Sequence, residues 1–542
     1  METTPVSRGP LPLAASRRPL ASLAPLALAV SVACAGAAPP EPPPSPHARP
    51  AAPTPSSAVE AASEAAAETA PEAIATAAPA IAAPDAPKIF SVGQTTWIRK
   101  KPEVKEGEFL GYVRTGSSVP LRSTERVTGV GCPRGFYQVA PRGYVCADRT
   151  VTETPPAGFL AAADATRGGE GPFPYRYALS DGAPMYNRVP TADEQARFEP
   201  KWAGKPGVFA KLPKGLRSHE ELATSEPIAP TDPIPTFLEN GGAAKEGPYD
   251  LVEQTLPLGS MLSYTKAFKA NGRTWLLSAD HTIVPADRVR AFKPSTFRGV
   301  DLAKGEATLP IAWMRVSARP KYAKKDGAML KTSASWPVRT FVELTGASSE
   351  IGGKRYLETR EAEAGAPLFV AEADATVVDR ETQRPASVKE GQKWLSIRLE
   401  QGTLVAYAGL EPAYATLVSP GKGGVPIKGR DPVEDATTPT GAYSVTFKDR
   451  AATMSREKGK NRSFWIQDVP HTQYFDPPFA LHAAYWHERF GEYVSAGCVN
   501  LSPIDAHRMF EWTDPPVPPS WQGATGAGAK DNGATTIVVV RR

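Results

Sequence analysis

The chain has 542 residues, which is too long for a single domain, so the sequence predicts several domains. Charged residues make up 22% and hydrophobic residues 41%, as in an ordinary globular protein and unlike a disordered chain. The formal net charge of +5 is small for this length, so charge gives no reason to expect a nucleic-acid partner.

The amino-terminal 34 residues have the pattern of an export signal. Arg17 and Arg18 precede the apolar run PLASLAPLALAVSVA, which is too short to remain as a membrane-spanning helix. The run ends at Cys34 and resembles a bacterial lipoprotein cleavage site, although Ser31 stands where leucine is usual. The alternative is ordinary cleavage near Ala-Gly-Ala, with Cys34 discarded. We therefore expect an exported protein of the periplasm or cell envelope, with Cys34 as the candidate lipid anchor.

Residues 35–86 consist largely of Ala, Pro, Ser and Glu, with few large apolar side chains. Such a segment cannot bury a core, so it is predicted to be a disordered tether.

Residues 87–152 alternate apolar and polar side chains in short runs such as TTWIRKKP, GFYQVAP and GYVCADR, which predict four or five short strands. This pattern resembles a bacterial SH3-like domain. Cys132 and Cys146 lie in one short stretch, and export implies an oxidising compartment, so we expect a disulfide between them. Closing a loop of ~15 residues would stabilise the domain by about 3 kcal/mol on the chain-entropy model.

The same arrangement recurs twice. LPLGSMLSYTKAF and RTWLLSADHTIVPADRV repeat it within 153–300, where a Pro-rich insert lies near 200–235. A third copy runs through FVELTGASSEIGGKRYLETR and ADATVVD within 301–387. We interpret these as diverged SH3-like modules in tandem. The alternative is one irregular β region whose parts are similar by coincidence.

Residues 388–542 are predicted to form a mostly β domain with its own core. Strands are expected at KWLSIRLEQGTLVAYAG, PAYATLV, FWIQDVP and TTIVVVRR. The segment SPIDAHRMFEWT is the one predicted helix of this region, with Ser502 at its cap and Pro503 in its first turn. Its apolar positions at helical spacing are Ala506, Met509 and Phe510.

One cysteine has no predicted partner. Cys498 lies in YVSAGCVNL, directly after a glycine. An unpaired cysteine in an exported protein is either an inert buried thiol or a reactive one. A thiol becomes a good nucleophile only as a thiolate, and a nearby imidazole can accept its proton. His482 and Cys498 each end a predicted apolar strand, so one sheet can bring them together.

The carboxyl-terminal region, roughly 390–542, resembles the L,D-transpeptidase (YkuD) catalytic domain family. Several motifs match in order: SPGKGG, TPTGAYSV, ALHAAYWHERFG and SAGCVNLSPIDA. In the family a His precedes a Ser/Thr-His-Gly-Cys-apolar-Asn/Arg motif by about fifteen residues. Here His482 lies sixteen positions before Cys498. The other positions in register are Ser495, Gly497, Val499 and Asn500.

The resemblance implies a role for each matching residue. Cys498 would be the nucleophile and His482 the general base and acid. The backbone carbonyl of Ala483 would orient the imidazole, as a carboxylate does in other triads. Gly497 allows close packing, so its backbone amide and that of Cys498 are expected to face a developing oxyanion. Ser495 and Asn500 are expected to support this site.

The sequence departs from the family at Ala496, where the family usually has histidine. We hypothesise that His487 supplies the missing imidazole. The alternative is that His487 is an exposed loop residue. Tyr485, Trp486 and Arg489 follow His482 closely and are predicted to bind substrate, and Lys448 is a weaker candidate for binding stem carboxylates.

No cofactor or metal is expected. A zinc cluster would have to use the four histidines of this region and Cys498, but their spacing fits none of the usual ligand pairs. These histidines are His471, His482, His487 and His507.

The resemblance implies acyl transfer from a peptidoglycan tetrapeptide stem through Cys498. The acceptor would be an amine on a neighbouring stem, or on an outer-membrane or wall protein. With water as the acceptor, the same site would be an L,D-carboxypeptidase. A third hypothesis is a wall-binding scaffold whose catalytic site has decayed, with Ala496 as the trace. The predicted fold is therefore mainly β, with tandem small barrels before an L,D-transpeptidase-like domain.

Overall fold

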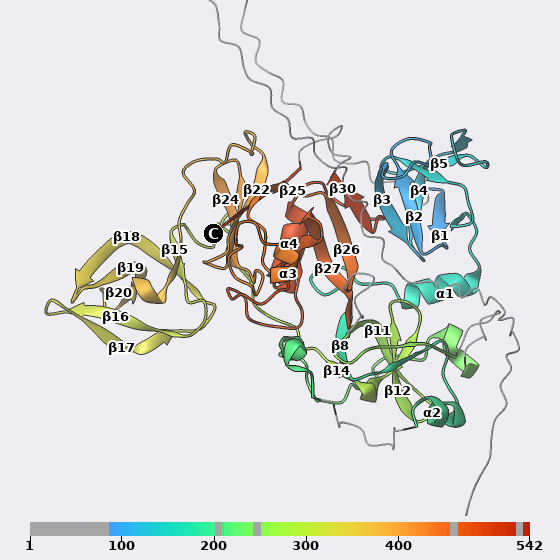
Figure 1. Ribbon diagram of the computed structural model, residues 1–542, viewed down its shortest axis with the longest axis horizontal. Coiled ribbons are helices and arrows are strands. Elements are labelled where there is room, and N and C mark those ends of the chain that lie inside the picture. The colour runs from blue at the N-terminus through green and yellow to red at the C-terminus, as the bar shows by residue number, and fades with distance from the viewer. Residues whose placement is uncertain (1–85, 201–208, 210, 242–250, 456–463, 527–534) are drawn as a thin grey trace, which may run out of the picture. The chain divides into compact units, whose positions relative to one another are not determined.

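The computed structural model describes residues 86–200, 209, 211–241, 251–455, 464–526 and 535–542, which form a mainly β structure (Figure 1). The predicted signal segment, Cys34 and nearly all of the predicted tether lie outside these residues. Within the part of the chain that is described, no helix has the length and apolar character needed to cross a membrane.

The first module contains seven strands paired in one continuous order. In spatial order, β7 pairs with β1, and β4, β5, β6, β2 and β3 follow. The strands are β1 (Lys88–Ser91), β2 (Thr95–Arg99), β3 (Phe109–Arg114), β4 (Ser118–Val127), β5 (Phe136–Val139), β6 (Tyr144–Cys146) and β7 (Val151–Thr152), and helix α1 (Ala157–Ala165) follows. Buried residues alternate along them and form one core. Cys132 and Cys146 are joined by a disulfide, with Cα atoms 5.8 Å apart.

The second module has the same strand order. β14 pairs with β8, followed by β11, β12, β13, β9 and β10. Its elements are β8 (Arg176–Ser180), β9 (Pro184–Tyr186), α2 (Ala192–Phe198), η1 (Lys214–His219), η2 (Thr236–Gly241), β10 (Val252–Thr255), β11 (Met261–Ala270), β12 (Arg273–Ser278), β13 (Ile283–Pro285), η3 (Ala286–Arg288) and β14 (Val289–Ala291). Of the helices, η1 lies in the predicted Pro-rich insert near 200–235, α2 and η2 flank it, and η3 directly precedes the last strand.

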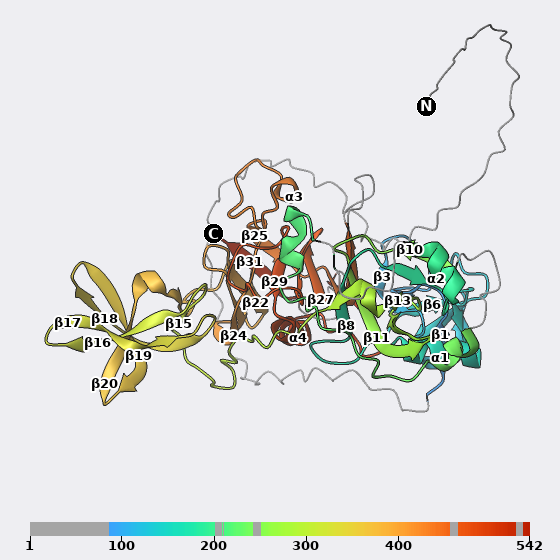
Figure 2. The ribbon, with the colours of Figure 1, turned by 90° about the horizontal axis from the view of Figure 1, so that it is seen from below.

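The third module repeats this order again, from β21 through β15, β18, β19 and β20 to β16 and β17. Its elements are β15 (Ile311–Trp313), β16 (Arg319–Lys325), β17 (Ala328–Trp336), β18 (Phe341–Ile351), β19 (Lys354–Glu363), β20 (Ala366–Ala371), η4 (Glu372–Asp374) and β21 (Thr376–Val378). Figure 2 shows its strands gathered as one group. Three copies of one seven-strand order support an internal repeat, as the sequence suggested. The name SH3-like remains a prediction.

The carboxyl-terminal domain has two sheets. The first has the order β24-β23-β22-β31-β25, in which the last strand of the chain pairs in parallel with β22. Its strands are β22 (Lys393–Arg398), β23 (Thr403–Ala408), β24 (Glu411–Leu417), β25 (Gly441–Ser444) and β31 (Ile537–Arg541). The second runs β30-β26-β27-β28-β29. Its strands are β26 (Phe447–Ser455), β27 (Trp465–Asp476), β28 (Phe479–Ala483), β29 (Val499–Leu501) and β30 (Gly523–Thr525). A short helix, α3 (Pro432–Asp435), precedes β25.

Helix α4 (Pro503–Trp512) directly follows β29 and is the helix predicted from SPIDAHRMFEWT. Ser502 caps it by accepting a hydrogen bond from the Asp505 amide at 3.1 Å. Its buried residues include Ala506, Met509 and Phe510, as their spacing predicted. Ala506 and Met509 share a core with Leu481 and Val499, so the helix covers one face of β28 and β29.

Backbone pairing joins the first two modules to the carboxyl-terminal domain. β3 pairs with β30 through Gly111↔Ala524 and Tyr112↔Gly523. β11 of the second module pairs in parallel with β27 at Met261↔Ile466. The third module instead contributes Trp313 and other side chains to a core that includes Phe490.

Candidate active site

Strands β28 and β29 place the site residues by their register. They run in parallel, with Leu481 opposite Val499 and His482 opposite Asn500. Successive side chains of a strand point to opposite faces, so Leu481 and Val499 enter the core under α4. His482 and Asn500 therefore project together from the other face.

Cys498 immediately precedes β29. Continuing the register by one residue places it opposite Ala480, on the same face as His482 and Asn500. Adjacent strands are about 4.8 Å apart and rise about 3.3 Å per residue, so the Cα atoms of Cys498 and His482 should be about 8 Å apart. Among the described residues, the Cys498 thiol donates its hydrogen bond to the carbonyl of Pro478, with Sγ 3.9 Å from the oxygen, and not to the His482 ring.

His482 is held in one tautomer. Its Nδ1 lies 3.1 Å from the carbonyl oxygen of Ala483, to which a protonated Nδ1 donates. This is the contact that the family resemblance implied. Nε2 is then the unprotonated nitrogen and can accept a proton. Trp486 lies against the imidazole, with ring centroids 6.0 Å apart, and limits its movement.

Burial keeps the thiol and the imidazole neutral at rest. It lowers the pKa of His482 to about 4, although the bond to Ala483 acts in the opposite direction. It raises the pKa of Cys498 to about 11, partly offset by a backbone hydrogen bond from Ala480. Cys498 is partly exposed, yet the surrounding chain removes enough water to disfavour a thiolate. A base that accepts the thiol proton during attack would offset this preference for the neutral thiol.

The turn before Cys498 is held by two hydroxyl groups. Ser495 Oγ donates to the carbonyl of Cys498 at 2.5 Å and accepts from the amide of Gly497 at 3.0 Å. Thr438 Oγ1 donates to the carbonyl of Gly497 at 2.8 Å. The expectation that the Gly497 amide faces an oxyanion is therefore corrected: Ser495 already occupies that amide. The sequence could not reveal this because it depends on how the turn folds back.

Glycine is required at position 497. Its φ is +130°, a conformation that L side chains rarely adopt. A Cβ there would lie 2.7 Å from the ring of Phe479 and 3.2 Å from the carbonyl oxygen of Thr437. The Gly-Cys pair of the sequence motif thus reflects the close packing of this turn on β28.

His487 and Asn500 form a buried pair, with the His487 side chain fully inaccessible and Asn500 2% exposed. The amide nitrogen of Asn500 lies 3.0 Å from His487 Nε2. The backbone amide of Arg489 donates to His487 Nδ1 at 3.2 Å. The alternative that His487 is an exposed loop residue is therefore wrong. Its contact with the site is the one that its ring makes with the Asn500 side chain.

Comparison with known families decides the class of this domain. Residues 392–539 match the family model of the L,D-transpeptidase catalytic domain, YkuD. This segment is the YkuD domain of the chain.

Several solved structures that resemble parts of the chain are named as L,D-transpeptidases. The Xylanimonas cellulosilytica protein is 22% identical over 29% of this chain and 65% of its own, with a TM-score of 0.20. The Stackebrandtia nassauensis protein is 22% identical over 30% and 62%, with a TM-score of 0.19. The E. faecium catalytic domain is 18% identical over 28% and 98%, with a TM-score of 0.20. The chain thus spans less than two thirds of the first two proteins. No curated protein matches it.

The residues predicted to bind substrate lie around the YkuD-domain site in different ways. Tyr485 is buried and stacks on Tyr177 of the second module, with ring centroids 3.8 Å apart. It lines a pocket of about 470 Å³ formed largely by that module, and its place there does not favour the predicted role. Trp486 contacts His482, as described above. Arg489 pairs with Glu492 at 3.0 Å.

Lys448 does not face the site. Its side chain is fully buried, and Nζ donates to the carbonyls of Phe510 at 2.6 Å and Thr513 at 2.8 Å, at the end of α4. Burial lowers its pKa to about 7. The suggestion that Lys448 binds stem carboxylates is therefore wrong, and the lysine instead satisfies the last carbonyls of the helix.

Sequence analysis missed two residues near Cys498. Thr438, in the Thr-Pro-x-Gly turn, holds the Gly497 carbonyl. Tyr474 pairs with Ala480 and therefore shares the face of Cys498 across three strands. Burial raises the pKa of Tyr474, and the charges of Asp449 and Cys498 raise it further, so the phenol remains a donor. The matched family turn points to Thr438, whereas only the register of β27 identifies Tyr474.

The loop after His482 is held by two modules outside the YkuD domain. Glu221 of the second module accepts from the Glu488 amide at 3.1 Å, and the Leu222 amide donates to the Trp486 carbonyl at 3.3 Å. From the third module, Arg339 forms an ion pair with Glu488 at 3.0 Å. The modules therefore shape the segment that carries Trp486 and His487.

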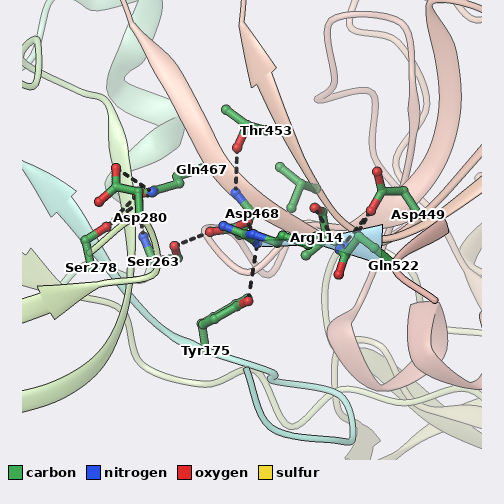
Figure 3. A network of polar contacts seen from close by, with 12 residues as sticks. Arg114, Tyr175, Ser263, Ser278, Asp280, Asp449, Thr453, Gln467, Asp468 and Gln522 are labelled. Atoms are coloured by element: carbon green, nitrogen blue, oxygen red, sulfur yellow. Dashed lines mark hydrogen bonds and ion pairs between the residues drawn. The ribbon is translucent and has the colours of Figure 1, made fainter. Parts of the chain in front are cut away.

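A buried polar junction joins three parts of the chain (Figure 3). Asp468 of β27 accepts from Arg114 of the first module at 2.6 Å and from Ser263 of the second at 2.5 Å. Its backbone amide donates to Thr453 at 3.3 Å. Tyr177 donates to the Asp468 carbonyl at 3.1 Å and stacks on Tyr485, which links this junction to the loop after His482.

Within the described ranges, no three His, Cys, Asp or Glu side chains are grouped so as to hold a metal ion. His471 and His507 do lie together, with ring centroids 4.9 Å apart, but they are only two.

Proposed function

We propose that the chain is a peptidoglycan L,D-transpeptidase in which Cys498 carries the acyl group. The observation that supports this most is the shared face of Cys498 and His482 on β28 and β29, within a domain that matches this family. The bond from His482 Nδ1 to Ala483 leaves Nε2 as the base.

The reaction begins with attack by Cys498 on the carbonyl of the third residue, a diamino acid, of a tetrapeptide stem. The thiol proton passes to His482 Nε2 as the S–C bond forms and the carbonyl becomes an oxyanion. The C–N bond then breaks, the leaving amine takes the proton from His482, and D-alanine is released. A thioester between Cys498 and the stem remains.

An amine then attacks the thioester and restores the thiol. If the amine belongs to a neighbouring stem, the product links the third residues of two stems. If it belongs to a protein, that protein becomes attached to the wall. We propose an exported protein of the periplasm or cell envelope, whose signal, tether and modules bring the site to the polymer.

The first experiment is intact-mass analysis of the full chain after incubation with a carbapenem, whose strained lactam acylates reactive thiols. We expect one added carbapenem on the wild type and none on Cys498→Ala. A folded wild-type protein with a reduced thiol and no adduct would contradict the proposal and favour a wall-binding scaffold.

A second experiment identifies the acceptor. The chain is incubated with a tetrapeptide stem, with and without an added diamino-acid amine, and the products are identified by mass. Cross-linked stems would support transpeptidation. Tripeptide alone, even at high amine concentration, would show that water is the acceptor and that the protein is a carboxypeptidase.

A further inference from the structure

The oxyanion of the proposed reaction lacks one of its expected donors, because Ser495 occupies the Gly497 amide. A buried anion without donors would be costly, and removal of a single oxyanion donor slows acyl transfer by about 10²–10³-fold in other enzymes. A side chain on the face of Cys498 must therefore be considered as a donor.

The contacts of His487 cannot all be satisfied with Asn500 in its present orientation. The Arg489 amide donates to Nδ1, which requires that a neutral ring carry its proton on Nε2. Nε2 then faces the amide nitrogen of Asn500 at 3.0 Å, and both are donors. If the ring proton were on Nδ1 instead, Nδ1–H would face the Arg489 N–H, and two donors would again meet.

The other half of the Asn500 amide provides the second observation. Its Oδ1 is buried and has no hydrogen-bond partner among the described residues. A 180° rotation of the amide exchanges two groups of nearly equal size. Oδ1 then accepts from His487 Nε2–H, and both contacts of the histidine become hydrogen bonds.

We propose that Asn500 has this rotated orientation and that its NH₂ group is the side-chain donor to the substrate oxyanion. The proposal rests on the proposed function above. Asn500 is then a catalytic residue, and His487 is a positioning residue that fixes the amide through Oδ1.

The position of Asn500 suits this role. It follows Cys498 by two residues, and if the extended geometry of β29 continues through Cys498, both side chains leave the same face with Cα atoms about 6.6 Å apart. Asn500 also lies directly opposite His482. A carbonyl carbon bound between the thiol and the imidazole would therefore lie on the face from which the Asn500 side chain leaves.

His487 is rigidly placed for positioning. Its ring packs against Phe490, with centroids 5.1 Å apart, and against Trp486 at 6.1 Å. The neighbouring Glu488 is held by Glu221 and Arg339 of two modules. The residue at 496 is an exposed alanine and has no imidazole, whereas His487 is buried and contacts Asn500.

In the proposed step, the Cys498 Sγ–C bond forms while the carbonyl π electrons move to oxygen, where the Asn500 N–H donates. When the oxyanion collapses, the C–N bond breaks and the hydrogen bond weakens again. No proton leaves Asn500, so the proton transfers through His482 remain balanced.

The test compares two reactions of the same thiol in the full chain. Carbapenem acylation forms an oxyanion, whereas iodoacetamide alkylation displaces iodide and forms none. We expect Asn500→Ala to lower the ratio of acylation to alkylation rate by about 10²–10³-fold. Asn500→Asp should lower it as much, because aspartate still accepts from His487 but cannot donate as a carboxylate.

His487 is tested by truncation and rescue. His487→Ala leaves the amide unfixed, so the ratio should fall by about 10-fold to 100-fold. His487→Gln retains an N–H donor toward Oδ1 and should restore most of the ratio. Equal losses in both rates would indicate only structural damage and would contradict the positioning role.

Tyr474 provides the rival donor. If Tyr474→Phe lowers the ratio more than 100-fold while Asn500→Ala leaves it unchanged, the assignment of Asn500 is wrong. A wild-type chain that forms no adduct would instead overturn the proposed function itself, so the two failures are distinguishable.

Discussion

The first and third modules have one strand order, but their equivalent edge strands meet different neighbours. β3 of the first module continues into the second sheet of the YkuD domain through β30. β17, its equivalent, pairs only with β16 among the described residues, and most of its side chains are exposed. One copy of a repeated fold can therefore share a sheet with the YkuD domain while another copy keeps a free edge.

The polar contacts follow the same division. Asp468 is 2% exposed where Arg114 of the first module reaches it, whereas Glu488 is 23% exposed where Arg339 of the third module does. An ion pair with a buried carboxylate depends on its partner, because a lone charge there cannot be hydrated. The comparison predicts that substitutions that destabilise the first module will also destabilise the YkuD domain.

The largest effect is expected at the β3–β30 seam. A Cβ at Gly111 would lie 2.2 Å from the carbonyl oxygen of Gly523 and 2.6 Å from the ring of Trp521. We expect Gly111→Val to destabilise the chain by at least about 3 kcal/mol, because the two strands must separate. Thermal unfolding and soluble yield measure this.

The matched control is Ser333→Val on β17, where the side chain is exposed. Its unfolding midpoint should remain near that of the wild type. Equal losses in both variants would show that the seam has no special importance.

Sequence alone predicted the elements that depend on local pattern. The strands alternate as expected, Ser502 caps α4, and the repeated arrangement of short strands predicted an internal repeat. The motif around Cys498 also identified residues that β28 and β29 place on one face.

The remaining features depend on contacts far apart in the chain. Position 111 must be glycine because the backbone of Gly523 lies close to it, and Arg114 forms an ion pair with the buried Asp468. Neither Gly523 nor Asp468 can be recognised as a partner from its neighbours in sequence. The use of the Gly497 amide by Ser495 depends on a tight turn, and the burial of His487 depends on the loop around it. Periodicity contains no information about such contacts.

The second prediction concerns the ion pairs. Arg114→Met leaves the Asp468 carboxylate buried without its partner and should cost about 3 kcal/mol in unfolding free energy. Arg339→Met removes the more exposed pair and should cost at most about 1 kcal/mol. Denaturant unfolding measures both. Adding Asp468→Asn to Arg114→Met should recover stability, since it removes the unpaired charge; a further loss would contradict this explanation.

The third prediction concerns acid. Burial, and then the nearby His507, lowers the pKa of His471 to about 3 from an ordinary value near 6.5. The unfolded chain therefore binds this proton first, and stability falls as the pH decreases from about 6.5 toward 3. From pH 7 to pH 5 the wild type should lose roughly 2 kcal/mol more than His471→Gln.

Denaturant unfolding at the two pH values measures this difference. The third module contains no histidine between residues 311 and 378. Its own stability should therefore not show the loss between pH 7 and pH 5 that His471 causes. Parallel pH curves for the wild type and His471→Gln would show that His471 does not contribute to acid sensitivity.

The smallest effect is expected at the exposed edge of the third module. Leu330 of β17 is 50% exposed, so Leu330→Lys removes little buried surface and adds a charge that opposes edge-to-edge pairing. Stability should change by less than about 0.5 kcal/mol, and the rate of carbapenem acylation should not change. Denaturant unfolding and intact-mass kinetics measure these quantities. A slower acylation with unchanged stability would mean that this edge acts on the loop after His482, and the third module would then be as integral to the enzyme as the first.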